Sequence, residues 1–183
     1  MATKYEWEKY NDNRIHQGDI FKNMPFYESY SEIQGEFSLS VIEFPLAIIL
    51  TQECDLKQNF IERIENKKQD KYLVSLLCAP LYNAQHLFSG ENLSELNVTT
   101  EKKNSEQKNY IKSNRDARYH YIELAEETEI PPIIIDFKHY FSISLYYLES
   151  KFENRICSIS PIFRESISQR FSHYLSRIGL PEK

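Results

Sequence analysis

The sequence has little glycine or methionine and no long apolar run. It contains four Gly and two Met, against 13 Tyr and 11 Phe, in 183 residues. Because aromatic side chains fit the pleated surface of a sheet, this balance favours strands over a helical bundle. We therefore expect a mainly β (α+β) protein. A chain of this length, 41% hydrophobic, can build one core, so a single domain is expected.

The cysteines are three in number and irregularly spaced: Cys54, Cys78 and Cys157. They predict neither a disulfide framework nor a CxxC zinc site, and we expect no metal and no cofactor. The first residues, MATKYEWEKYND, contain no apolar run typical of a signal peptide. No stretch approaches the roughly 20 apolar residues that cross a bilayer. These absences predict a cytoplasmic protein with reduced thiols and no membrane association.

Acidic residues outnumber basic ones, 27 to 22, which gives a net charge of −5. A negative protein does not attract nucleic acid through its overall field, so RNA binding would require a local basic patch. The tract 101–116 is rich in Lys, Glu and Asn, and we interpret it as a solvated face.

Apolar patterning predicts short strands along most of the chain. They lie at 15–21, 37–42, 46–50, 72–78, 118–124, 133–137 and 140–148. A loop is predicted from Pro25 to Gly35, and Pro45 is predicted to separate two strands. The polar insert at 56–71 is expected to form a short surface helix or a long hairpin, and the insert at 81–117 is expected to hold one or two short helices and a mobile segment. Residues 1–14 form a predicted N-terminal arm, and 15–183 form the single domain.

A C-terminal amphipathic helix is the clearest predicted element, over 161–178. Ser160 is placed to cap it, Pro161 suits its first turn, and Gly179 with Pro181 supplies its end. Arg164 lies at the margin of the apolar stripe. A half-buried guanidinium there needs a carboxylate or a ligand anion as its partner.

The stretch LAIILTQECD, residues 46–55, predicts a buried strand that holds Glu53, Cys54 and Asp55 at its end. Cys54 could act as a nucleophile if Arg118 or His120 lay alongside, because a positive neighbour stabilises a thiolate. The alternative interpretation is a structural cysteine at the end of a strand.

Basic and aromatic residues form a second set of candidates. Barrels bind oligonucleotides across one face, with basic side chains on phosphates and aromatic rings on bases. The alternative is that the arginines make structural ion pairs with Asp55, Glu123 or Asp136. The candidate nucleic-acid-binding residues are Arg118, Tyr119, Tyr121, Arg155, Arg164 and Arg170.

The order of these segments resembles the MazF/PemK family of small SH3-like barrels from bacterial toxin-antitoxin loci. The resemblance is carried by QGDIF (17–21), FPLAIILTQ (44–52), VSLLCAP (74–80), YIEL (121–124), IIIDF (133–137) and the terminal helix. It implies an SH3-like, partly open barrel with helical inserts. In this family a basic residue precedes the Pro-Ala-Val strand, whereas this sequence has Glu43 and Phe44, so RNA cleavage stays an open question.

Two functions are consistent with these patterns. The first is a toxin-antitoxin or defence-associated RNA-binding protein. If it cleaves RNA, Glu53 or Asp55 would act as general base, while Arg118, His120 and Arg164 would contact phosphate. The second is a non-catalytic interaction subunit of a larger bacterial defence complex with an ATPase or nuclease partner. Either a homodimer or a hetero-complex with a neighbouring-gene product is expected.

Overall fold

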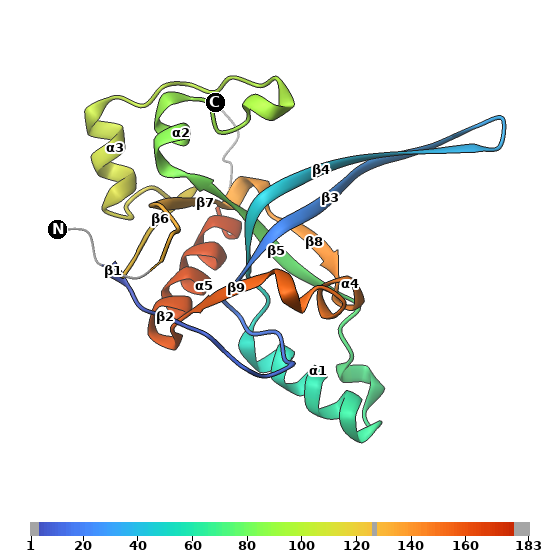
Figure 1. Ribbon diagram of the computed structural model, residues 1–183. Coiled ribbons are helices and arrows are strands. Elements are labelled where there is room, and N and C mark those ends of the chain that lie inside the picture. Colours follow the sequence, from blue (N-terminus) through green and yellow to red (C-terminus); the bar gives the residue numbers. More distant parts are fainter. Residues whose placement is uncertain (1–3, 126–127, 178–183) are drawn as a thin grey trace, which may run out of the picture. The chain divides into compact units, whose positions relative to one another are not determined.

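The computed structural model describes residues 4–125 and 128–177 (Figure 1). These residues form two compact units, which are described separately. Unit 1 takes 4–8, 82–125, 128–139 and 159–177, and unit 2 takes 9–81 and 140–158. Strands and helices occur in both units, so the fold is mixed α+β.

Unit 2 is built on an antiparallel sheet. Its strands are β3 (Asp19–Ile33), β4 (Glu36–Ile49), β5 (Ser75–Asn83), β8 (Phe141–Ser144) and β9 (Arg155–Ile159). β3 pairs with β4, β4 with β5, and β5 with β8, while β9 returns to pair with β3. Three rings form an aromatic cluster, in which Phe141 lies 5.7 Å from Phe26 and 5.4 Å from Phe44.

The longest feature of unit 2 is a two-stranded ribbon formed by β3 and β4 (Figure 1). Its strands stay paired as far as Ile33 and Glu36, and its turn uses Gln34 (φ 54°) and Gly35 (φ 82°). Two successive positive φ values are typical of the type I′ turn that joins tightly twisted strands. The predicted loop between Pro25 and Gly35 is therefore wrong.

Pro45 does not break β4, contrary to the prediction of two separate strands. The ladder has no pair at this position, where Pro45 lacks an N–H, and Asn23 opposite takes a positive φ of 54°. The ladder resumes with Leu46 opposite Lys22. The strand thus passes the proline by skipping one pair.

Four short helices complete unit 2. They are α1 (Glu53–Glu65), η1 (Gln69–Lys71), α4 (Leu145–Glu149) and η4 (Phe152–Asn154). The predicted helix in the 56–71 insert is confirmed, although it begins earlier, at Glu53. The predicted strand 140–148 is only half right, because Leu145 and Leu148 are buried at helical spacing in α4.

Unit 1 contains a smaller sheet in which β6 (Tyr119–Leu124) lies between two partners. β1 (Lys4–Tyr5) is parallel to it and β7 (Ile133–Asp136) is antiparallel. The remaining elements are β2 (Trp7–Glu8), α2 (Ala84–Ser89), η2 (Ser94–Leu96), α3 (Ser105–Lys112), η3 (Phe137–His139) and α5 (Pro161–Leu175). Tyr5 in the N-terminal arm is buried and its ring lies 4.5 Å from that of Phe163.

The C-terminal helix α5 begins at Pro161 after Ser160, as predicted, but the Ser160 side chain makes no capping hydrogen bond, contrary to its predicted role. Its Phe171 packs against Phe137 with ring centroids 5.5 Å apart. The predicted stop at Gly179 and Pro181 lies outside the described residues. Within the described ranges, no helix combines the length and the apolar character needed to cross a membrane.

Candidate functional site

The predicted strand-end cluster opens a helix instead. β4 ends at Ile49, and Glu53, Cys54 and Asp55 form the first turn of α1. Cys54 is exposed, and its Sγ lies 3.6 Å from Gln52 Oε1 and 3.8 Å from Asp55 Oδ1. These oxygens supply no positive charge for a thiolate. The interpretation of Cys54 as a structural cysteine at a strand end is therefore wrong, because Cys54 lies exposed in the first turn of α1, and its described contacts give no support to the nucleophilic interpretation.

Glu53 is the member of this cluster with strong partners. Its Oε1 lies 2.7 Å from the Arg14 guanidinium and 3.5 Å from His16 Nδ1, and its Oε2 accepts the Gln17 N–H at 3.0 Å. Burial alone would raise the pKa of Glu53, but the bonds from His16, Gln17 and Arg14 hold it at about 2. Glu53 is a fixed anion that ties α1 to residues 14–17.

Arg155 organises the neighbouring part of unit 2. Its guanidinium donates to the carbonyl oxygens of Tyr10 (3.0 Å), Asp12 (2.7 Å) and Arg14 (2.7 Å), and lies 3.4 Å from Asp19 Oδ2. Its donors are thus directed at the protein itself. These bonds give Arg155 a structural role inside unit 2, and its contact with nucleic acid stays a prediction.

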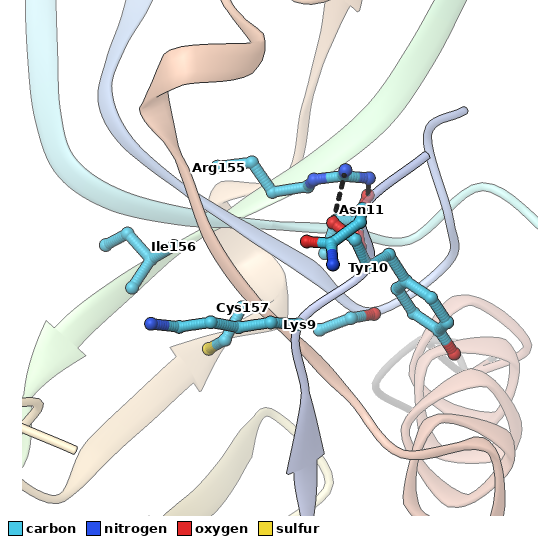
Figure 2. Close-up of a pocket in the computed structure, with 8 residues that line it drawn as sticks. Lys9, Tyr10, Asn11, Arg155, Ile156 and Cys157 are labelled. Carbon is cyan, nitrogen blue, oxygen red and sulfur yellow. Dashed lines mark hydrogen bonds and ion pairs between the residues drawn. The ribbon is translucent and has the colours of Figure 1, made fainter. Parts of the chain in front are cut away.

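A polar cavity of about 210 Å³ lies beside Arg155 (Figure 2). Lys9, Tyr10 and Cys157 are among the residues that line it. Two buried atoms in its lining, Asp19 Oδ1 and Ser158 Oγ, have no hydrogen-bond partner among the described residues. Burial raises the pKa of Asp19 and raises that of Cys157 to about 12. Cys157 therefore presents a neutral thiol rather than a reactive thiolate to the cavity, which Lys9 and Arg155 also line.

Arg118 and His120 both lie on or beside β6 in unit 1, and both are committed to protein partners. Arg118 forms a two-pronged ion pair with the fully buried Asp136, at 2.7 and 2.5 Å. His120 Nε2 lies 2.9 Å from the Tyr5 hydroxyl. Burial, helped by the positive charge of Arg170, lowers the pKa of His120 to about 3. His120 is therefore uncharged at neutral pH.

The two candidate arginines of α5 also lie in unit 1. Arg170 donates to the carbonyl oxygens of Asn114, Asp116 and Tyr119, so it fastens α5 to the segment that leads into β6. Arg164 is half-buried on the same helix. The predicted catalytic residues thus divide between the units: Glu53, Cys54 and Asp55 belong to unit 2, and Arg118, His120 and Arg164 to unit 1.

A basic pocket of about 370 Å³ lies among α2, α3 and β6 in unit 1. Lys102, Lys108 and Lys112 line it together with the aromatic rings of Phe88 and Tyr121. The ammonium groups of Lys108 and Lys112 lie 5.8 and 5.7 Å from the Phe88 ring centroid. Its lining contains no carboxylate. Across the described chain, none of the three lysines is ion-paired with an acidic side chain.

Local backbone signals place these side chains. Asn104 and Gln107 form a capping box at the start of α3, with both bonds at 2.9 Å. Gly90 ends α2 with φ 86°, and a side chain there would collide with the Thr100 carbonyl. Bonds from Thr100 N–H to Gly90 O (2.9 Å) and from Lys103 N–H to Phe88 O (3.0 Å) fold the loop back. This return brings Lys102 beside α2.

Sequence reasoning included Tyr121, which lines this pocket, among its candidates but did not include the lysines. They belong to the tract interpreted as a solvated face, and Phe88, which completes the pocket, comes from another helix. The one local signal is that Lys108 and Lys112 lie four residues apart, which places them on the same side of a helix.

The described residues contain no cluster of three or more His, Cys, Asp or Glu side chains able to hold a metal ion. Comparison of the sequence with protein-family models and with curated proteins gives no match.

Proposed function

We propose that this protein binds single-stranded RNA through the basic pocket of unit 1, as a toxin-antitoxin or defence-associated RNA-binding protein. One observation carries the proposal: three lysines that lack carboxylate partners line one pocket with two aromatic residues, and two of these lysines lie near the Phe88 ring. In a chain of net charge −5, such a pocket is the local basic patch that RNA binding requires.

The residue types suit the two halves of a nucleotide. Lysine ammonium groups attract phosphates, and an aromatic ring stacks on a base with little regard to its identity. Burial raises the pKa of Tyr121 to about 12, so its hydroxyl stays neutral, and that hydroxyl donates to Glu123 at 3.1 Å. The ring is therefore held in place, and because Tyr121 is only 5% exposed it forms a fixed wall of the pocket rather than an open stacking face. Only an unpaired strand exposes bases for such contacts.

The described contacts favour binding over cleavage. Arg118 is committed to Asp136, and His120 is neutral and bonded to Tyr5. Neither is available as the charged group that would act on a phosphate. Cleavage is tested directly by incubating labelled RNA with the wild type and with Arg164→Ala, and an intact RNA pool in both is the expected result.

The strand order of unit 2 supports an SH3-like, partly open barrel and thus a distant relation to MazF/PemK proteins. The strands β3, β4, β5 and β8 pair in sequence order, and the last strand, β9, returns to the first. A last strand that pairs with the first is how a meander begins to close on itself. Among the described strands no pairing joins β8 to β9, so the barrel that we propose would be partly open.

RNA binding is tested with the full chain and a fluorescein-labelled 12-nucleotide RNA of mixed sequence, by fluorescence anisotropy. Three lysine–phosphate contacts predict a log–log salt slope of about −2 for a single strand. Affinity should then fall about 20-fold between 50 and 200 mM salt. The triple variant Lys102→Gln, Lys108→Gln and Lys112→Gln should weaken binding at least tenfold.

A matched control removes the same charge from unit 2. Lys67, Lys68 and Lys71 form exposed ion pairs on α1 and η1. Their triple change to Gln should leave the affinity within twofold of the wild type. Equal losses in both triple variants, or an affinity that does not depend on salt, would contradict the proposal.

A further inference from the structure

The outer part of the β3–β4 ribbon is apolar on one face. Register places Tyr27 opposite Val41 and Tyr30 opposite Leu39, and Phe37 lies on the same face because it is two residues from Leu39. All five side chains are exposed, from 44% for Val41 to 83% for Tyr30. We call this set the ribbon stripe. It is a continuous apolar surface rather than a scatter of single residues.

The opposite face of the ribbon is mostly polar, with Ile33 beside the turn as its one strongly exposed apolar side chain among the described ribbon residues. Ser29 pairs with Ser40 and Ser31 with Ser38 in the register. Ser40 also donates to Glu28 at 2.8 Å. The two faces therefore differ sharply in chemistry, although they share the same backbone. The ribbon stripe is therefore confined to one face of the ribbon, and substitutions on the other face can serve as controls.

The described residues of unit 2 give the stripe no cover. Pairing of β3 with β9 ends at Phe21, and pairing of β4 with β5 starts at Ala47. A two-stranded hairpin alone is at most marginally stable in water. The three aromatic rings expose on the order of 400 Å², and patches of this size mark interaction sites. That is about half of one side of a standard protein interface.

The charges around the ribbon stripe indicate what kind of partner can cover it. No Lys or Arg occurs between Lys22 and Lys57, whereas the ribbon carries four glutamates. Register places Glu32 opposite Phe37, and Glu43 lies two residues from Val41, so a glutamate stands at each end of the stripe. These charges repel RNA phosphates. Two copies docked face to face would also set glutamate against glutamate, whichever way the ribbons ran.

We propose that the ribbon stripe docks a different protein, whose apolar strip carries Lys or Arg at both ends. Apolar area supplies affinity, and the paired charges fix the register and exclude other partners. This gives the chain a docking role in a hetero-complex. It is independent of RNA binding, because the lysine pocket belongs to unit 1 and the ribbon to unit 2.

The test co-expresses the tagged full chain with the product of each adjacent gene. Four versions are compared: wild type; the stripe variant Tyr30→Ser, Phe37→Ser and Leu39→Ser; the charge variant Glu32→Lys and Glu43→Lys; and an opposite-face control, Ser29→Thr, Ser31→Thr and Ser38→Thr. Circular dichroism checks that each version folds, and light scattering after gel filtration gives its mass. Anisotropy with the labelled RNA is measured in parallel.

One neighbouring-gene product should co-purify in a fixed ratio with the wild type and the opposite-face control. Recovery should fall at least tenfold with the stripe and charge variants. Exchanging Lys or Arg for Glu in that partner should restore binding to the charge variant. RNA affinity of the stripe variant and of the opposite-face control should equal that of the wild type, so failure here is distinguishable from failure of RNA binding. The charge variant is left out of this comparison, because replacing glutamate by lysine removes repulsion of phosphates and adds attraction.

Three results would overturn the proposal. One is a wild-type dimer that the stripe variant converts to a monomer, which would make a second copy the occupant. Another is loss of RNA affinity in the stripe variant, which would make RNA the occupant. The third is the absence of any neighbouring-gene product whose recovery depends on both the apolar and the acidic residues.

Discussion

Replacing Glu53 with Gln should destabilise unit 2 in a way that depends on pH. The change keeps the size of the side chain but removes the charge that faces Arg14 and His16. Glu53 has a pKa of about 2 in the folded protein, against an ordinary value of 4.5. This difference corresponds to about 3 kcal/mol of folding free energy. Because 24% of the side chain is exposed, solvent screening reduces the expected loss to about 2 kcal/mol at pH 7.

The sign of the pH dependence follows from the lowered pKa. The carboxylate contributes its full stabilisation above pH 4.5, where both folded and unfolded chains are ionised. That contribution is lost as the pH falls from 4.5 towards 2, because the unfolded chain takes up the proton first. The wild type and Glu53→Gln should therefore differ most at pH 7 and converge near pH 2.

Urea denaturation followed by circular dichroism, at pH 7, 5 and 3.5, measures this difference. Asp55→Asn is the matched control, since it removes another carboxylate from the first turn of α1 but one that is exposed. The control should change the unfolding free energy by about 0.5 kcal/mol or less. Equal effects of the two changes at pH 7, or an undiminished effect of Glu53→Gln at pH 3.5, would refute the reasoning.

Three other predictions concern the remaining candidate residues. At neutral pH a thiol reagent should label Cys54 rapidly and spare Cys78 and Cys157, whose pKa values are raised by burial; a second fast label in native protein would contradict this. The pKa of His120 is lowered to about 3, so between pH 6.5 and 3 the unfolded chain binds a proton that the folded chain excludes. The free energy of unfolding of the wild type therefore falls with decreasing pH in this range, and His120→Phe should reduce that slope by up to about 1.4 kcal/mol per pH unit. Arg170→Leu should lower the free energy of unfolding by about 2–4 kcal/mol and speed amide exchange at residues 114–119. Unchanged exchange there would show that the bonds from Arg170 to these carbonyl oxygens are not needed.

Elements with local signals were predictable from the sequence. The start of α5 follows from Ser160 and Pro161, which suit a cap and a first turn whatever the rest of the chain does. The strand β7 follows from a continuous apolar run, and β6 follows from a short stretch rich in Tyr and Ile. In each case the deciding signal lies within a few neighbouring residues, and tertiary contacts did not change the local preference.

The β3–β4 ribbon is a region where local sequence patterns did not predict the structure fully. Alternation of Phe37, Leu39 and Val41 correctly predicted a strand, but the prediction that this strand is half-buried was wrong, because all three side chains are exposed. Period-two patterning says which residues share a face and leaves open whether another layer covers that face. The loop predicted after Pro25 failed for a related reason, since β3 gains its ladder from β4 despite its Ser and Glu content.

The basic residues separate according to the shape of their head groups. Arg155 and Arg170 each donate to three carbonyl oxygens, because a planar guanidinium with five donors matches a cluster of backbone acceptors. A lysine ammonium is a strongly hydrated point charge on a flexible stem, and it matches such clusters poorly. Lys108 and Lys112 accordingly stay on the surface with their charges open to a ligand. In this net negative protein, arginines that look like phosphate ligands in the sequence build the fold, while lysines in an apparently bland tract form the stronger candidate for an RNA site.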